Sequence, residues 1–144
     1  DPDGLALLPQ PFVTVAQSKV KDLRLALDLA EEWDKLNTSS ALLTGVTVVR
    51  KDFAKAHPEA VKNYMKAYEA SVAFTKDSPE EAAKLIGSYD IVPETIAIKA
   101  LPYCKISFIT GQELKDTLTG YLEVLYKADP KAVGGALPGD DFYY

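Results

Sequence analysis

The sequence predicts a helix-rich α/β fold whose β-sheet is incomplete within these residues. Three short apolar or β-branched segments in the first 50 residues are typical of strands, and helical patterns follow them. Layered α/β folds combine strands and helices in comparable number, so three strands followed by about four helices is an unbalanced count. We therefore expect other strands of the same sheet to lie outside this chain.

The predicted strands differ in how clearly their composition indicates them. Residues 5–8 are wholly apolar, which favours a strand covered on both faces. Residues 23–29 place a leucine at every second position, which favours a strand, although their Leu, Ala and Arg content also suits a helix. Residues 44–49 contain three valines and two threonines around Gly45, the composition most typical of a strand.

Proline positions and apolar spacing predict the helices. Pro11 suits a first helical position, so a helix is expected to begin near Phe12, and residues 31–36 should form a helical turn. Pro58 opens a longer helix, and a further helix should run from Pro93 to about Ala100. The helix after Pro58 carries apolar residues three and four positions apart, namely Val61, Tyr64, Met65, Tyr68 and Val72. Such a stripe favours a core face, although Tyr64 and Tyr68 could also stack on an aromatic ligand.

Two capping boxes predict two further helix starts. Ser78 with Glu81, and Thr110 with Glu113, have the spacing at which a cap side chain and a carboxylate satisfy free backbone N–H groups. Pro130 should end the second of these helices. Residues 37–40 form a predicted polar loop.

Composition and single-copy residues exclude several classes of function. Sixteen Lys and Arg against twenty-one Asp and Glu give a formal charge of −5, and the cations are scattered, which excludes nucleic acid as a partner. The single Cys104 and the single His57 cannot form an internal disulfide or a zinc site of Cys and His. No glycine loop for phosphate is present. We therefore predict no metal, no cofactor, no catalytic residue and no enzymatic activity.

The segment from Leu8 to Phe12 is the candidate binding edge. Two prolines fix the backbone where a buried strand is predicted to end, and they present a Gln amide and an aromatic ring there. Ligands of open α/β sheets bind at the carboxyl ends of strands, so this edge could hold one. The alternative is a rigid turn with Phe12 in the core, and the sequence leaves both open.

The order of several segments resembles the second half of a bacterial ABC-transporter solute-binding protein, and the resemblance covers nearly the whole chain. The branch is that of the nitrate, sulfonate, taurine and thiamine-pyrimidine binders, with the type II periplasmic-binding-protein fold. The segments are LLPQPFVT (7–14), LDL (27–29), EW (32–33), GVTVVRKDF (45–53), HP (57–58), SPEEAA (78–83), LPYC (101–104) and GGALP (134–138).

The resemblance implies an architecture and a location. Such proteins have two α/β lobes that close around a ligand like a flytrap, and they deliver it to an ABC permease. Residues 1–40 would then be the end of the second lobe and the crossover, and residues 41–144 the mainly helical C-terminal part of the first lobe. The protein would be extracytoplasmic and lipid-anchored, and uncovered sheet edges could pair with another copy of the chain.

The resemblance also implies ligand-binding residues, namely Pro9, Gln10, Pro11, Phe12 and Thr14. Many relatives have Glu where this chain has Gln10, so the neutral amide removes a charge that a cationic ligand would need. Two other functions remain open. One is an enzyme similar to the thiamine-pyrimidine synthases, which use a motif rich in His and Cys, whereas this chain has only His57 and Cys104. The other is a helical protein-interaction module.

Overall fold

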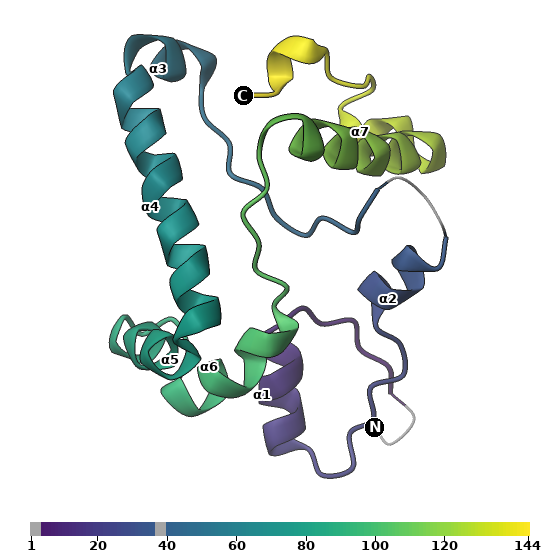
Figure 1. Ribbon diagram of the computed structural model, residues 1–144. Helices are drawn as coiled ribbons and strands as arrows, with labels where there is room; N and C mark the ends of the chain where they lie inside the picture. Colours follow the sequence, from purple (N-terminus) through teal and green to yellow (C-terminus); the bar gives the residue numbers. More distant parts are fainter. Residues whose placement is uncertain (1–3, 37–39) are drawn as a thin grey trace. The chain divides into compact units, whose positions relative to one another are not determined.

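The computed structural model describes residues 4–36 and 40–144, and its regular secondary structure there is helical (Figure 1). Residues 1–3 and 37–39, and with them most of the predicted polar loop, lie outside this description. The fold is helix-rich, as predicted, and within the described ranges no strand forms at all. In the same ranges, no helix combines the length and apolarity that crossing a membrane requires.

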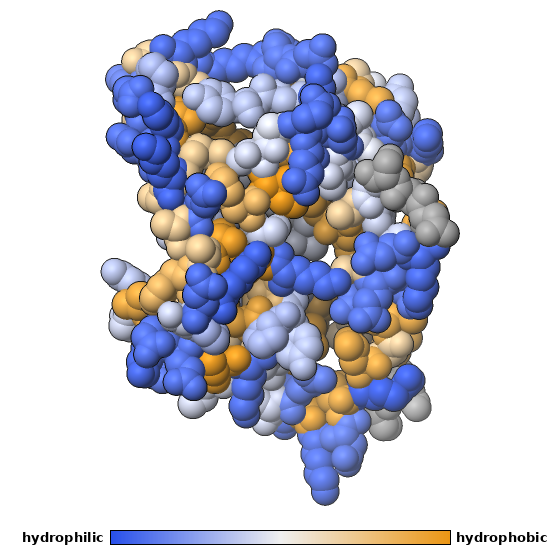
Figure 2. All heavy atoms as spheres, in the orientation of Figure 1, coloured by the Kyte–Doolittle hydropathy of each residue, from blue (hydrophilic) through white to orange (hydrophobic). Residues whose placement is uncertain are grey.

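The three strand predictions are wrong for this chain. Residues 5–8 and 44–49 have no regular secondary structure, and residues 23–28 lead irregularly into a helix that begins at Leu29. A strand is stable only when neighbouring strands satisfy its backbone, and no such neighbour is present in the described part. Their side chains are accordingly exposed: Leu5 by 93%, Leu27 by 62% and Val48 by 76%. Figure 2 shows hydrophobic residues, in orange, reaching the surface.

The chain forms two compact units, each built from two stretches of sequence. The first comprises Asp1–Arg24 and Lys51–Phe108, and the second comprises Leu25–Arg50 and Ile109–Tyr144. The predicted lobe boundary at residue 40 concerns the lobes of a longer protein and stays a prediction.

Most helices of the first unit begin where the prolines predict. They are α1 (Phe12–Lys19), α3 (Lys51–Ala56), α4 (Pro58–Asp77), α5 (Pro79–Ser88), α6 (Glu94–Ala100) and the 3₁₀ turn η1 (Leu101–Tyr103). On α4, Val61 and Val72 are buried, as the apolar stripe predicts, whereas Tyr64 is 49% exposed. The stripe is therefore a core face only in part.

Small side chains form the core of the first unit. Helices α5 and α6 pack against each other, and they bury four alanines, Ala82, Ala83, Ala97 and Ala100, each at most 3% exposed. At Gly87 a Cβ atom would lie 3.1 Å from the backbone nitrogen of Glu94, so the two helices meet closely there. Helix α1 and turn η1 both contact α6, which makes α6 the centre of this unit.

The second unit consists of α2 (Leu29–Asp34), α7 (Gly111–Ala128) and the 3₁₀ turns η2 (Pro130–Val133) and η3 (Asp140–Phe142). The Trp33 ring packs on Tyr121 with centroids 5.3 Å apart, and its indole N–H donates to Ser40 Oγ at 3.1 Å. Ser40 approaches α7 at Gly120, where a Cβ atom would lie only 2.8 Å from Ser40 Cβ.

The capping boxes locate the helix starts, but their capping hydrogen bonds do not form. Ser78 and Thr110 precede α5 and α7 as predicted, yet neither side chain makes a capping hydrogen bond. Ser78 also ends α4, where its N–H donates to Phe74 O, so one residue serves two helices. Side-chain caps form instead at Asp28, whose carboxylate accepts from Ala30 N at 2.9 Å, and at Asp129, whose carboxylate accepts from Lys131 N at 3.0 Å.

We expect Gly120→Ala to destabilise the protein. The added methyl group must displace Ser40, and overpacking of this kind costs about 1–3 kcal/mol, partly offset by the higher helix propensity of alanine. Because Trp33 is the single tryptophan, its fluorescence should shift as the Ser40 hydrogen bond is lost. Chemical denaturation followed by that fluorescence is the measurement. Gly45→Ala, whose Cβ would meet nothing within 4 Å, should change neither signal.

The C-terminal residues of the second unit should make its stability depend on pH. Lys115 Nζ donates to Asp140 Oδ1 at 2.8 Å, and this hydrogen bond, with the Asp140 charge, raises the pKa of Lys115 above its ordinary 10.5. A lysine whose pKa is higher in the folded than in the unfolded state stabilises the fold below its unfolded pKa of 10.5. That contribution to the free energy of unfolding is lost as the pH rises through the raised pKa. Unfolding midpoints at pH 8 and pH 11.5 should therefore differ more in the wild type than in Asp140→Asn. An equal difference in both proteins would refute the coupling.

Candidate functional site

The predicted binding segment forms the entry to α1. We call Pro9, Gln10, Pro11, Phe12 and Thr14 the α1 rim. The first backbone bonds of the helix, Val13 N to Pro9 O at 3.2 Å and Val15 N to Pro11 O at 3.0 Å, hold this segment as a turn that leads into the helix. The peptide bond between Gln10 and Pro11 is cis. Helix α1 rests on α6, so the core of the first unit positions the rim.

A hydrogen bond within the α1 rim orients its amide. The Thr14 hydroxyl donates to Gln10 Oε1 at 2.8 Å, and Thr14 is only 7% exposed. Because the amide oxygen accepts this bond, the Gln10 NH₂ group, a donor of two hydrogen bonds, is left for another partner. The rim therefore presents an oriented neutral donor, which suits an acceptor oxygen of a ligand.

Phe12 supplies the apolar part of the α1 rim. Phe12 is 59% exposed, so the alternative in which it fills the core does not hold for the described residues. An exposed ring beside an amide donor can stack on a flat apolar group while the amide binds an oxygen. Whether the five rim residues bind a ligand stays a prediction.

The aromatic residues of α4 form a second group in the first unit. The rings of Tyr64 and Tyr68 are stacked, with centroids 6.0 Å apart and planes at 17°. Phe108 meets Tyr68 edge-on, with centroids 5.7 Å apart. Tyr68 is half-buried by these contacts, whereas half of the Tyr64 side chain is exposed.

The structure keeps His57 and Cys104 apart. His57 comes just before α4 and packs on Phe53 with ring centroids 4.8 Å apart. Cys104 follows η1, whose residues lie beside Thr75 and Lys76 at the other end of α4. A helix of 20 residues is about 30 Å long, so the two side chains cannot act as a pair within this unit. Burial raises the pKa of the Cys104 thiol, which keeps it protonated and a weak nucleophile.

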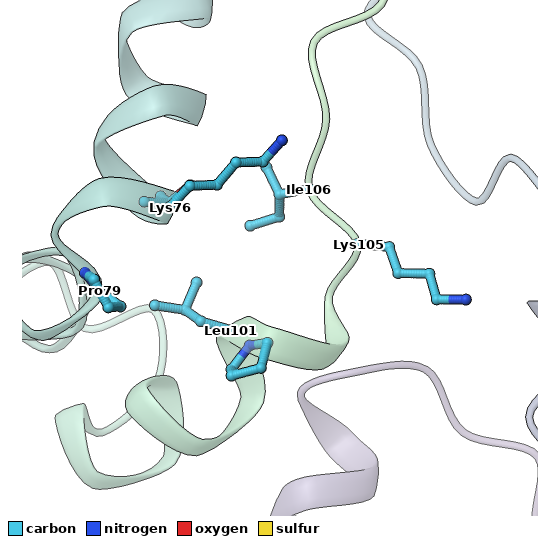
Figure 3. A pocket seen from close by; sticks show the side chains of 7 residues that line it. Lys76, Pro79, Leu101, Lys105 and Ile106 are labelled. Carbon is cyan, nitrogen blue, oxygen red and sulfur yellow. The ribbon is translucent and has the colours of Figure 1, made fainter.

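A cavity at the C-terminal end of α4 has no counterpart in the sequence prediction. It measures about 340 Å³, and seven residues line it, namely Thr75, Lys76, Pro79, Leu101, Pro102, Lys105 and Ile106 (Figure 3). The sequence did not predict this cavity, because its walls come from four separate segments, namely α4, α5, η1 and the segment after η1. No sequence motif contains all four. Among residues 4–36 and 40–144, no cluster of three or more His, Cys, Asp or Glu side chains could hold a metal ion.

The fold is similar to that of a solved ABC-transporter protein. The crystal structure of an ABC transporter from Parabacteroides distasonis superposes with a TM-score of 0.67 at 26% sequence identity. The match covers 95% of this chain and 47% of that one, so this chain spans about half the length of that protein. The chain therefore has an ABC-transporter-like fold. No curated protein sequence matches it.

A protein-family model also matches the chain. The model is described as menaquinone biosynthesis, and it covers residues 14–126, from the α1 rim to near the end of α7. This match overturns the prediction that the protein is not an enzyme, because it is to a family of a biosynthetic pathway. The prediction rested on the lack of a zinc site, a phosphate loop and a catalytic residue, and such patterns detect only some kinds of catalytic chemistry. With more than half of its residues matched, the chain belongs to the menaquinone biosynthesis family.

Proposed function

We propose that this chain is part of an enzyme of menaquinone biosynthesis, and that its α1 rim contacts a small organic precursor. The observation that carries the proposal is the family match over residues 14–126, which spans elements of both compact units. The match leaves out residues 9–13, so the role of the rim rests on its geometry rather than on the family.

The chemistry of the α1 rim supports a ligand of this kind. Menaquinone contains a quinone ring, so its precursors supply flat carbon skeletons and oxygen atoms. The exposed Phe12 ring suits the skeleton, and the Gln10 NH₂ group, oriented by Thr14, suits an oxygen. A neutral amide would bind a carbonyl, hydroxyl or carboxylate oxygen without favouring a cation.

A second candidate function is supported by the fold similarity to an ABC transporter. In it, the chain is the C-terminal half of a type II periplasmic binding protein of the nitrate, sulfonate, taurine or thiamine-pyrimidine type. It would capture a small solute outside the cytoplasm, anchored by a lipid, and would deliver it to an ABC permease. The family match favours the alternative that the sequence left open, an enzyme of the same fold, over the importer. A mechanism that uses His57 and Cys104 together is not supported, because the two residues lie at opposite ends of α4.

Deleting the gene in its own organism should abolish menaquinone synthesis. We expect menaquinone to fall below detection by mass spectrometry of the lipid extract, with one water-soluble precursor accumulating. A plasmid copy of the gene should restore the quinone. Unchanged menaquinone would refute the biosynthetic proposal, and loss of uptake of a labelled solute in the same strain would favour the importer.

Two substitutions test the α1 rim with the precursor that accumulates in that strain. Phe12→Ala should weaken its binding about fivefold, as expected from the loss of one stacking contact of about 1 kcal/mol. Thr14→Val should also weaken it, because the Gln10 amide loses its orientation, whereas Thr14→Ser keeps the hydroxyl and should bind as the wild type does. Isothermal titration calorimetry is the measurement.

The matched control is Phe53→Ala, which removes another partly exposed ring, 41% exposed and on α3. It should leave the affinity unchanged. Equal affinity of Phe12→Ala and the wild type, with both proteins folded by circular dichroism, would remove the rim from the binding site.

A further inference from the structure

The cavity at the C-terminal end of α4 is a second candidate site in the first unit. We propose that it binds a small organic anion whose apolar body is about the size of one ring, with Lys76 pairing the acidic group. This inference uses none of the residues of the α1 rim, and it does not depend on the proposed function.

The size and walls of the cavity suit a small apolar body. Its volume of about 340 Å³ is near the lower end of the range, roughly 300–1,000 Å³, that small-molecule sites occupy. Four of its lining residues are apolar, namely Pro79, Leu101, Pro102 and Ile106. Two of these are prolines, whose rings fix the backbone, so that part of the wall loses little freedom when a ligand binds.

The charge at the cavity indicates an anion. Lys76 and Lys105 line it, and no acidic residue does. Figure 3 shows the Lys76 side chain extending across the cavity toward Ile106, whereas Lys105 points away from the other lining side chains. Within the described ranges the Lys76 ammonium has no ion-pair partner. Its carbon chain can therefore cover the apolar body while its ammonium donates to a carboxylate.

The other polar side chain of the lining does not compete for that role. The Thr75 hydroxyl donates to Val72 O at 2.8 Å, so its proton is committed to the helix. Lys76 is then the one lining side chain that both faces the cavity and carries a donor for an anion.

Contacts outside the cavity hold its far wall in place. Lys105 has a left-handed backbone, with φ of 49°, at the point where the chain leaves η1. Three residues later, Phe108 packs edge-on against Tyr68 of α4, with ring centroids 5.7 Å apart. The segment is thus attached to α4 beyond Ile106, and Ile106 is held beside Thr75 and Lys76 before any ligand arrives.

A fluorine NMR titration of the protein with 4-(trifluoromethyl)benzoate tests the inference. The benzoate should bind with a millimolar dissociation constant, and the neutral 4-(trifluoromethyl)benzyl alcohol about fivefold more weakly. Lys76→Gln should lower the affinity for the benzoate to that for the alcohol, whereas Lys76→Arg should leave the affinity for the benzoate as in the wild type. Lys66→Gln, at another exposed lysine of α4, is the matched control and should not change the affinity.

Amide shifts in the wild-type protein supply a second measurement that needs no variant. Shifts on adding the benzoate should centre on Thr75, Lys76, Leu101 and Ile106. The inference is overturned by no detectable binding, by equal affinity for acid and alcohol, or by equal affinity of Lys76→Gln and the wild type. Shifts centred on Gln10 and Phe12 would also overturn it, and would assign the acid to the α1 rim.

Discussion

The close approach of α5 and α6 is the constraint on which the first unit depends. Four alanines and Gly87 allow the two helices to meet nearly backbone to backbone. Helix α1, with the rim, rests on α6, and η1, with part of the cavity wall, continues from it. The α1 rim and the cavity are therefore both positioned by a helix contact whose side chains are no larger than a methyl group.

Small side chains also explain why so much apolar surface is left over. Among the described residues no large side chain is fully buried, while leucines and valines of the strand-like segments are exposed. Burial of apolar area is the main favourable term in folding, at about 25 cal/mol per Å². The exposed leucines and valines are therefore suited to packing against further polypeptide. This agrees with the match of the chain to about half of a longer ABC-transporter protein.

The sequence predicted the helices well because their signals are local. Pro11, Pro58, Pro79 and Pro93 lie within one residue of the helix starts, since a fixed φ acts on the residues beside it. The strands at 5–8, 23–29 and 44–49 failed because a strand depends on partners that a pattern along one chain cannot supply. The hydrogen bond between Thr14 and Gln10 joins residues four positions apart, as on one face of a helix, so the sequence could have predicted it. The cavity beside Lys76 did not, because four separate segments build it, and the enzyme family was missed because its chemistry has no motif here.

Ser78 is the single residue between α4, which ends at Asp77, and α5, which begins at Pro79. No longer linker separates the two helices, and Pro79 restricts the backbone of Ser78, the residue before it. Because one restricted residue connects the two helices, a rotation of α4 would also move α5 and its alanine contacts with α6. Residues 41–50, by contrast, form no helix, so their backbone can change conformation without breaking helical hydrogen bonds.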